Sequence, residues 1–267
     1  MSDPQICVSL DSVTVDGVKD EAVRANLAGA DMIELRFDRL FLNRPEPIEI
    51  ASDEEEGETK KVMPDENDWQ VSDFSDLDVS DVISQLKEAI PLPVVFTCRP
   101  VREGGFFPGT EEERISVLEA AIDSGVSWVD LELSMDEDTR KELKSKADSG
   151  STKVICSIHD TEGTPASDDI ANMVKENQDS GDVVKICTTA RDHQDALQLV
   201  EAAGQLKEMG LNHSLMALNS GGDWLRLHAP IFDQSIVYAT MKNEFRLSDK
   251  GLVNVRDLKD AWSILEY

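Results

Sequence analysis

Short apolar runs rich in β-branched residues recur along the chain. Most begin about 25–30 residues after the run before, which is the length of a strand followed by a helix. The sequence therefore predicts an α/β protein with eight strands. The predicted strands cover residues 5–10, 31–37, 93–98, 127–133, 153–158, 182–188, 213–218 and 235–240.

Amphipathic stretches separate the apolar runs and predict helices. Residues 17–30 and 191–210 repeat small or apolar residues at a spacing of three to four and end in turns that contain glycine. Thr110 is followed three residues later by Glu113, a capping-box pattern that opens another helix. Residues 255–267 predict a last amphipathic helix.

The number and alternation of the predicted strands and helices match those of a (β/α)8 barrel. We expect a single barrel domain over residues 1–267. A doubly wound open sheet is the alternative, because sequence alone does not show whether a sheet closes. No G-x-G-x-x-G follows the first strand and no P-loop motif occurs, so no nucleotide-binding motif supports that alternative.

One of the predicted strand–helix units is longer than the others. The second and third predicted strands are separated by 55 residues, and the acidic part of this segment lies at about 44–80. Its composition is typical of a solvated, mobile loop. We expect a tolerated surface insertion and assign it no function.

The charge is strongly negative and is not confined to the insertion. Asp and Glu number 54 against 26 Lys and Arg, which gives a net charge of −28. Residues 46–81 hold 14 of the acidic residues and two basic ones, so the other 231 residues still carry −16. Nucleic-acid binding needs a basic surface and is not expected. Acidity spread in this way favours adaptation to a salt-rich cytoplasm over one acidic tail.

Location and redox state follow from the apolar segments. No apolar run approaches the ~20 residues that cross a bilayer, and the first residues lack the features of a signal peptide. We expect a cytoplasmic protein that binds no membrane. The cysteines are far apart and each lies in an apolar run, which favours buried free thiols over disulfides or a metal site. They are Cys7, Cys98, Cys156 and Cys187.

Candidate chemistry lies at the carboxyl ends of the predicted strands, where barrels of this kind place their reacting groups. Each polar residue alone has an ordinary structural explanation, such as a lysine whose stem is buried and whose head reaches water. Together they could form an imine with a ketone, move a proton and hold an anionic substrate. The polar residues at these ends are Glu34, Arg36, Arg99, Glu103, Asp130, Glu132, His159, Lys185 and Arg226.

Lys185 is the candidate nucleophile of this set. It lies within the apolar run DVVKICT, and both faces of a barrel strand are covered. Burial disfavours the ammonium form, so we expect a lowered pKa for Lys185 and a free amine.

The motifs at these strand ends resemble those of the type I 3-dehydroquinate dehydratases. The resemblance extends over nearly the whole chain outside the acidic insertion, and each motif falls at the end of a successive predicted strand. The matching segments are IELRFD (33–38), FTCRPVREGG (96–105), CSIHD (156–160), VVKICTTA (183–190) and LRLHAPIFDQSIVYATM (225–241).

The resemblance implies an enzyme that dehydrates 3-dehydroquinate to 3-dehydroshikimate in the shikimate pathway of aromatic amino acid biosynthesis. It implies that Lys185 forms a Schiff base with the C3 ketone, that His159 is general base and acid, and that Glu103 orients His159. The matching substrate-binding residues are Glu34, Arg36, Arg99, Arg226 and Ser248, the last in a loop that closes over the site. No metal, nucleotide or organic cofactor is implied, and we expect a homodimer.

The closing loop departs from the family pattern. The family often has a glutamine where this chain has Leu252, which cannot hydrogen-bond a substrate hydroxyl. Lys250 and Asn254 are nearby candidates for that contact. Two other functions stay open: a class I Schiff-base aldolase, which the segment NSGGDW weakly allows as a phosphate loop, and a non-catalytic barrel that binds a small acid.

The distributed charge leads to a prediction about salt. We expect the melting temperature to rise from low salt to molar KCl, because the Debye length shortens to ~3 Å at about 1 M and self-repulsion weakens. Scanning calorimetry across a KCl series measures this. A melting temperature that stays flat or falls would contradict the salt adaptation.

Overall fold

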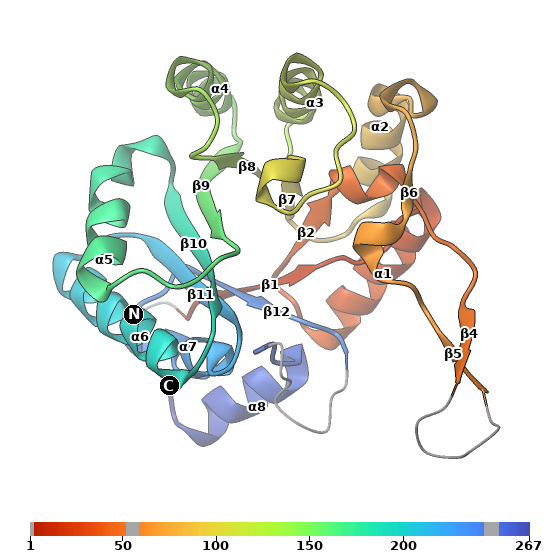
Figure 1. Ribbon diagram of the computed structural model, residues 1–267. Coiled ribbons are helices and arrows are strands. Elements are labelled where there is room, and N and C mark those ends of the chain that lie inside the picture. The colour runs from red at the N-terminus through yellow and green to blue at the C-terminus, as the bar shows by residue number, and fades with distance from the viewer. Residues whose placement is uncertain (1–2, 52–58, 243–250) are drawn as a thin grey trace.

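The computed structural model describes residues 3–51, 59–242 and 251–267 (Figure 1). Eight parallel strands lie side by side in chain order and curl into a nearly closed barrel. All eight predicted strands are confirmed. They are β1 (Gln5–Ser9), β2 (Met32–Arg36), β7 (Val94–Thr97), β8 (Trp128–Glu132), β9 (Lys153–Asp160), β10 (Val183–Ala190), β11 (His213–Asn219) and β12 (Ile236–Ala239).

Side chains complete the join between the last two strands. β11 and β12 are the ends of the hydrogen-bonded sheet order, and between them the Ser235 amide donates to the His213 carbonyl at 2.9 Å. Ser214 Oγ donates to the Ile236 carbonyl at 2.7 Å, and Gln234 Oε1 accepts from the Leu215 amide at 2.7 Å. These bonds bring the edge strands together, so the open-sheet alternative is wrong.

A helix follows each strand of the barrel, directly or after further short elements. The capping box predicted at Thr110 is confirmed, because Thr110 Oγ1 accepts from the Glu113 amide and Glu113 Oε2 accepts from the Thr110 amide. Within the described ranges, no helix is long and apolar enough to cross a membrane. The helices are α1 (Val15–Ala28), α2 (Val79–Ala89), α3 (Glu111–Asp123), α4 (Glu137–Ser149), α5 (Ser167–Glu176), α6 (His193–Met209), α7 (Gly222–Leu227) and α8 (Val255–Ile264).

The barrel interior is layered, and its lowest layer is apolar. The apolar cluster that includes this layer takes one or two side chains from each strand. Since side chains alternate along a strand, the residues two positions later also face inward. Met216, which pairs with Cys187, and Tyr238, which follows Ile236 by two residues, lie above the lowest layer. The cluster consists of Cys7, Met32, Val95, Trp128, Ile155, Val183, Met216, Ile236 and Tyr238.

Polar side chains occupy the inward positions above this apolar floor. Two residues further along six of the strands come Ser9, Glu34, Thr97, Asp130, Ser157 and Lys185. A further two residues along lie Arg36, Arg99, Glu132, His159 and Cys187. The strand period of two therefore delivers the candidate residues to one end of the barrel.

The acidic insertion is partly ordered structure, so its interpretation as a mobile loop is wrong for the described part. β4 (Ile48–Ala51) and β5 (Thr59–Val62) form an antiparallel hairpin that extends away from the barrel (Figure 1). β3 (Leu42–Asn43) pairs with β6 (Gln70–Val71). Composition alone missed these elements, because backbone pairing does not need apolar side chains throughout.

Aromatic contacts anchor the end of the insertion to the barrel. Phe74 lies in a short 3-10 helix, Phe74–Asp76, that follows β6. Its ring centroid is 6.1 Å from that of Phe41 and 5.5 Å from that of Phe107. Aromatic pairs at such distances stabilise beyond the area they bury, so this segment is held in place.

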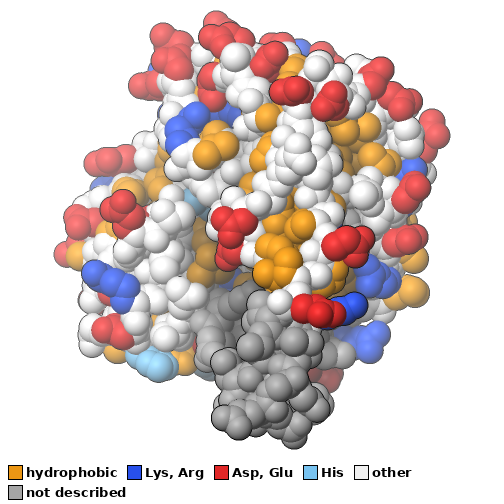
Figure 2. Space-filling model, turned by 45° about the vertical axis from the view of Figure 1, so that its right-hand side comes forward, with side chains coloured by type: hydrophobic (Ala, Val, Ile, Leu, Met, Phe, Trp, Pro, Cys, Tyr) orange, Lys and Arg blue, Asp and Glu red, His pale blue; other side chains and the backbone are white. Residues whose placement is uncertain are grey.

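Acidic side chains are spread over the surface outside the insertion as well. Figure 2 shows them across the visible face, with hydrophobic side chains between them. The described cysteines are free, and Cys7, Cys98 and Cys156 are buried as expected.

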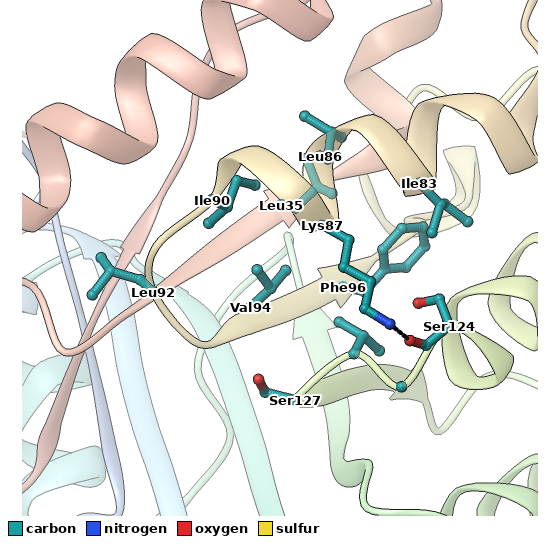
Figure 3. A pocket seen from close by; sticks show the side chains of 12 residues that line it. Leu35, Ile83, Leu86, Lys87, Ile90, Leu92, Val94, Phe96, Ser124 and Ser127 are labelled. Atoms are coloured by element: carbon teal, nitrogen blue, oxygen red, sulfur yellow. Dashed lines mark hydrogen bonds between the residues drawn. The ribbon is translucent and has the colours of Figure 1, made fainter.

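An apolar cavity of about 150 Å³ lies between α2 and the barrel wall (Figure 3). Side chains from α2, β2 and β7 face it, among them Leu86, Leu35 and Val94. Lys87 crosses it and donates a hydrogen bond to the Ser124 carbonyl. The cavity is a packing defect away from the polar layers of the barrel.

Filling this cavity should stabilise the fold. Val94→Ile adds one methylene group and is expected to raise the free energy of unfolding by about 0.8 kcal/mol. The adjacent Val95→Ile is the matched control, since Val95 is fully buried in the barrel floor and overpacking there should destabilise by about 1–3 kcal/mol. Urea unfolding in high salt measures both. Equal destabilisation by the two variants would show that the cavity cannot accept the group.

Candidate active site

Lys185 is buried in the polar layer of the barrel and is paired with two carboxylates. Its side chain is 3% exposed, and Nζ lies 3.1 Å from Asp130 Oδ2 and 3.4 Å from Glu34 Oε1. Nζ is also 4.4 Å from the centre of the Tyr238 ring, within cation–π range. The amine is therefore held from three strands at once.

The charge state expected for Lys185 is corrected by these contacts. Burial alone would lower the pKa of Lys185, as the sequence suggested. The carboxylates of Asp130 and Glu34 outweigh that effect and raise the pKa above its ordinary value. The resting site therefore holds an ammonium group, so the expectation of a free amine is wrong for this state.

His159 is aligned by a chain of polar side chains at the rim. Its Nδ1 lies 2.9 Å from Glu103 Oε2, and Ser134 donates a hydrogen bond to Glu103 Oε1. Arg102 Nε donates to Ser134 Oγ at 3.2 Å. Both carboxylate oxygens of Glu103 accept hydrogen bonds, so the neutral imidazole carries its proton on Nδ1 and leaves the Nε2 lone pair free.

The environment keeps His159 neutral. Burial lowers its pKa well below the ordinary value, and the positive charges of Arg99, Lys185 and Arg36 act in the same direction. Nε2 is buried and has no hydrogen-bond partner among the described residues. A neutral imidazole with an unoccupied nitrogen is a general base at neutral pH.

Two glycines shape the loop that carries Glu103. After β7 the chain makes a short 3-10 helix, Val101–Glu103, which ends at Gly104 with φ of 74°. The next residue, Gly105, packs so closely on the Arg99 carbonyl that a Cβ there would lie 2.1 Å from its oxygen. The motif RPVREGG thus folds back on the strand end and turns Glu103 toward His159.

Arg36 and Arg99 are organised by Asp38 and Glu34. Asp38 is fully buried and binds Arg36 in a two-pronged pair at 2.9 and 2.7 Å. It also accepts the backbone amides of Arg99 and Phe106 at 3.3 and 3.1 Å. Arg99 lies 3.5 Å from Glu34, and its Nε has no hydrogen-bond partner among the described residues.

Arg226 bonds to backbone carbonyls of the protein itself, and the closing loop is described only in part. Arg226 is buried in α7, where its guanidinium donates to four carbonyls at 2.7–2.9 Å, including those of Tyr238 and Gly251. A substrate contact by Arg226 stays a prediction. Ser248 lies outside the described residues. Leu252 is described and half-buried, and the replacement of the family's glutamine there stays open.

A cavity of about 480 Å³ opens at this end of the barrel. Its lining joins the predicted residues Arg36, Arg99, Glu103 and His159. Cys187 also lines it, two residues after Lys185 on the same face of β10. Arg36, Arg99, Glu103 and His159 therefore converge on one cavity that is large enough for a small organic acid. Lys185 and Glu34 are not among its lining residues, and each lies two residues before a lining residue on its own strand.

The insertion contributes to this cavity, which the sequence interpretation missed. Asp65, Glu66 and Asn67 are among the lining residues. Glu66 accepts two hydrogen bonds from Arg39, at 2.7 and 2.9 Å, and Arg39 itself lines the cavity. An acidic composition gave no sign of this contact, because the partner is distant in sequence.

Other groups of the site were also missed or given no role. The sequence predicts no role for Asp130, and it gives no sign that Asp38 or Ser134 belongs to the site. The available signal for Asp130 and Glu132 was two carboxylates inside the apolar run SWVDLEL. Both are completely buried, and burial of Glu132, despite its pair with Arg114, raises its pKa to about 7.

Comparison with known proteins connects this geometry to one family. Residues 6–267 match the family described as type I 3-dehydroquinase. The chain is 28% identical over 266 residues to a 3-dehydroquinate dehydratase of Salmonella agona, which covers 98% of this chain and 93% of the relative. It is also 28% identical to the bifunctional 3-dehydroquinate dehydratase/shikimate dehydrogenase of Arabidopsis thaliana, but spans only 36% of that longer protein.

Solved structures show the same barrel. A type I 3-dehydroquinate dehydratase of Clostridium difficile, with covalent modified comenic acid, has a TM-score of 0.78 and 23% identity, over 98% of this chain and 92% of that one. The 3-dehydroquinate dehydratase of Geobacillus kaustophilus also has a TM-score of 0.78, with 22% identity over 99% and 92%. At these identities the structural likeness supports the fold.

The electrostatic coupling in the site leads to a prediction about His159. Lys185→Met removes a positive charge that opposes protonation of the imidazole, so the pKa of His159 should rise toward its ordinary value. NMR of the imidazole nitrogens from about pH 4 to pH 8 measures the titration. An unchanged or lowered pKa for His159 would contradict the coupling.

Proposed function

The chain belongs to the type I 3-dehydroquinase family and is a hydro-lyase that converts 3-dehydroquinate to 3-dehydroshikimate; we propose that Lys185, His159 and Glu103 carry out this reaction. The observation that supports these roles is one juxtaposition. A buried lysine and a neutral histidine with a free Nε2 lie on neighbouring strands, β10 and β9, at the same end of the barrel. The reaction belongs to the shikimate pathway of aromatic amino acid biosynthesis.

Lys185 supplies the covalent step. Its amine attacks the C3 ketone of the substrate, and loss of water gives an iminium that withdraws electrons from C2. The apolar floor of the barrel beneath Lys185 limits the access of bulk water to the imine. Covalent catalysis in this way divides a difficult elimination into easier steps.

His159 moves the proton. Its free Nε2 removes a proton from C2 to give an enamine, and the imidazolium then protonates the C1 hydroxyl as it leaves. Hydrolysis of the resulting imine releases the product and regenerates the amine. Glu103 accepts the Nδ1 hydrogen bond and so sets both the ring orientation and the tautomer.

The arginines hold the substrate's polar groups. Arg99 lines the cavity, and its Nε has no hydrogen-bond partner among the described residues, while Asp38 holds Arg36 in orientation. Both guanidiniums are therefore assigned to the binding of an anionic, hydroxylated ligand. Glu34 is assigned to a substrate hydroxyl group on the family resemblance. Arg226 and Ser248 are assigned to the carboxylate and the closing loop on the family resemblance.

Product analysis separates this function from its alternatives. The dehydratase yields one absorbing enone acid, whereas a class I aldolase yields two carbonyl fragments. A silent binding barrel would bind the substrate without turnover. The family match supports the dehydratase over both.

We further propose that each chain forms one barrel domain and that two chains associate as a homodimer. We also propose that the enzyme works in a salt-rich cytoplasm. The charge of −28 supports the salt-rich environment. Exposed apolar side chains on α6, on the segment after α7 and at the carboxyl end of α8 support association between copies. They include Leu197, Ile231 and Ile264. Sedimentation in high salt distinguishes a monomer from a dimer.

Substitutions should separate the roles of lysine and histidine. Lys185→Ala should abolish both turnover and borohydride trapping of the substrate, because no imine can form. His159→Ala should lose about 10²–10⁴-fold in turnover but still form a trapped adduct, although slowly. Glu103→Ala should be milder than either, since Glu103 acts through His159.

Mass spectrometry after borohydride reduction reads these outcomes directly. Lys175→Ala is the control, because Lys175 is exposed on α5 and should leave turnover and trapping unchanged. An adduct on a lysine other than Lys185, or normal turnover of Lys185→Ala, would overturn the mechanism.

A further inference from the structure

Lys185 carries a proton in the resting site, and none of the roles proposed above removes that proton. An amine attacks a ketone only as the free base, and the carboxylates around Lys185 hold the proton on it. Because Lys185 is 2% exposed, the proton has no direct path to bulk water. A neighbouring group must take it when the substrate arrives.

The two carboxylates in contact with Lys185 differ sharply in their other partners. Glu34 accepts hydrogen bonds from Ser9 Oγ at 2.6 Å and from Thr97 Oγ1 at 3.0 Å. Its pKa is lowered, because Lys185, Arg99 and Arg36 outweigh the effect of its burial. A carboxylate satisfied in this way is a weak base.

Asp130 is much less compensated. Its Oδ2 lies 3.1 Å from Lys185 Nζ and 3.9 Å from Arg99. Its Oδ1 is buried and has no hydrogen-bond partner among the described residues. A proton on Asp130 would therefore displace fewer hydrogen bonds than a proton on Glu34.

His159 is a poorer acceptor for this proton. The positive charges around it oppose protonation, and its Nε2 is needed for the substrate C2 proton. No hydrogen bond joins it to Lys185 among the described residues, whereas Asp130 is in direct contact.

We propose that Asp130 is a further catalytic residue, the base that takes the proton from Lys185 and returns it during imine formation. This proposal rests on the proposed function. The Lys185 ammonium and the Asp130 carboxylate become amine and carboxylic acid, and the amine nitrogen bonds to C3 of the ketone. The nitrogen passes one of its protons to the former ketone oxygen to give a carbinolamine, and Asp130 returns the other proton to that oxygen as it leaves as water. The balance is ammonium plus ketone giving iminium plus water, with no proton lost to solvent.

Other titratable groups surround Asp130 and Lys185, and the proposal assigns none of them a new role. They face Asp130 or Lys185 from the neighbouring strands and the loop after β7, and they comprise Cys7, Glu34, Arg99, Glu103, Glu132, His159 and Tyr238. A test must therefore separate proton transfer by Asp130 from a general change of charge in the barrel.

Rapid quenching with borohydride measures the rate of imine formation on Lys185 directly. In the full-length Asp130→Asn enzyme mixed with 3-dehydroquinate in high salt, we expect the rate near neutral pH to fall by about 10²-fold or more. Asp130→Asn also lowers the pKa of Lys185, because one of the two carboxylates that raise it is lost. Below that pKa the rate should rise about tenfold per pH unit, because the lysine must lose its proton to hydroxide, while the wild type depends less steeply on pH. Asp130→Glu should keep the wild-type pH slope, and Asp130→Ser repeats the test if the amide variant does not fold.

Glu132→Gln is the matched control. Glu132 lies two residues along on the same face of β8 and is equally buried, but it pairs with Arg114 at 2.7 Å rather than with Lys185. Because burial raises the pKa of Glu132 to about 7, this variant is compared at about pH 8 and above, where the Glu132 carboxylate is ionised. There it removes a charge from the same strand face and should form the imine at nearly the wild-type rate.

The outcomes distinguish the proposals. Imine formation at the wild-type rate in Asp130→Asn, or a loss that is equal at every pH, would overturn the role of Asp130 and leave the dehydratase function intact. An equal loss in Glu132→Gln would also overturn it, since the effect would then be one of general charge. A wild-type enzyme that shows no adduct on Lys185 would overturn the proposed mechanism and this inference together.

Discussion

The pairing of one buried ammonium group constrains the rest of the site. Lys185 lies in the barrel interior, where an uncompensated charge would cost far more than a folded domain can tolerate. Glu34 and Asp130 compensate it, and Glu34 is in turn bound by Ser9, Thr97 and Arg99. The polar layer above the apolar floor is thus one connected network.

The same network divides the acid–base roles. Carboxylates next to Lys185 favour its charged form, whereas the cations around His159 favour the neutral imidazole. Two groups on neighbouring strands are therefore kept in different charge states, Lys185 as a cation and His159 neutral. Lys185 must lose its proton before it attacks the substrate, so the covalent step requires a local proton acceptor. His159 is already neutral and is itself the acceptor of the substrate proton.

The acidic character of the chain has different consequences inside and outside the barrel. On the surface it produces self-repulsion that salt screens. Inside, acidic residues are matched individually: Asp38 with Arg36, Glu132 with Arg114, and Glu103 with His159. The insertion has acidic residues of both kinds. It carries many surface charges, and it also places Glu66 against Arg39 at the cavity.

The sequence by itself determined the barrel and the identity of most site residues. The repeating apolar runs, the capping box at Thr110 and the motifs at the strand ends all depend on local spacing, which survives without knowledge of distant contacts. The tertiary structure alone decided the protonation of Lys185, the place of Glu66 at the cavity and the contact of buried Asp130 with Lys185. These depend on groups that are distant in the sequence: Glu66 meets Arg39 across 27 residues, and Asp130 on β8 meets Lys185 on β10 across 55. Electrostatic energy depends on distance in space, and no spacing along the chain encodes it.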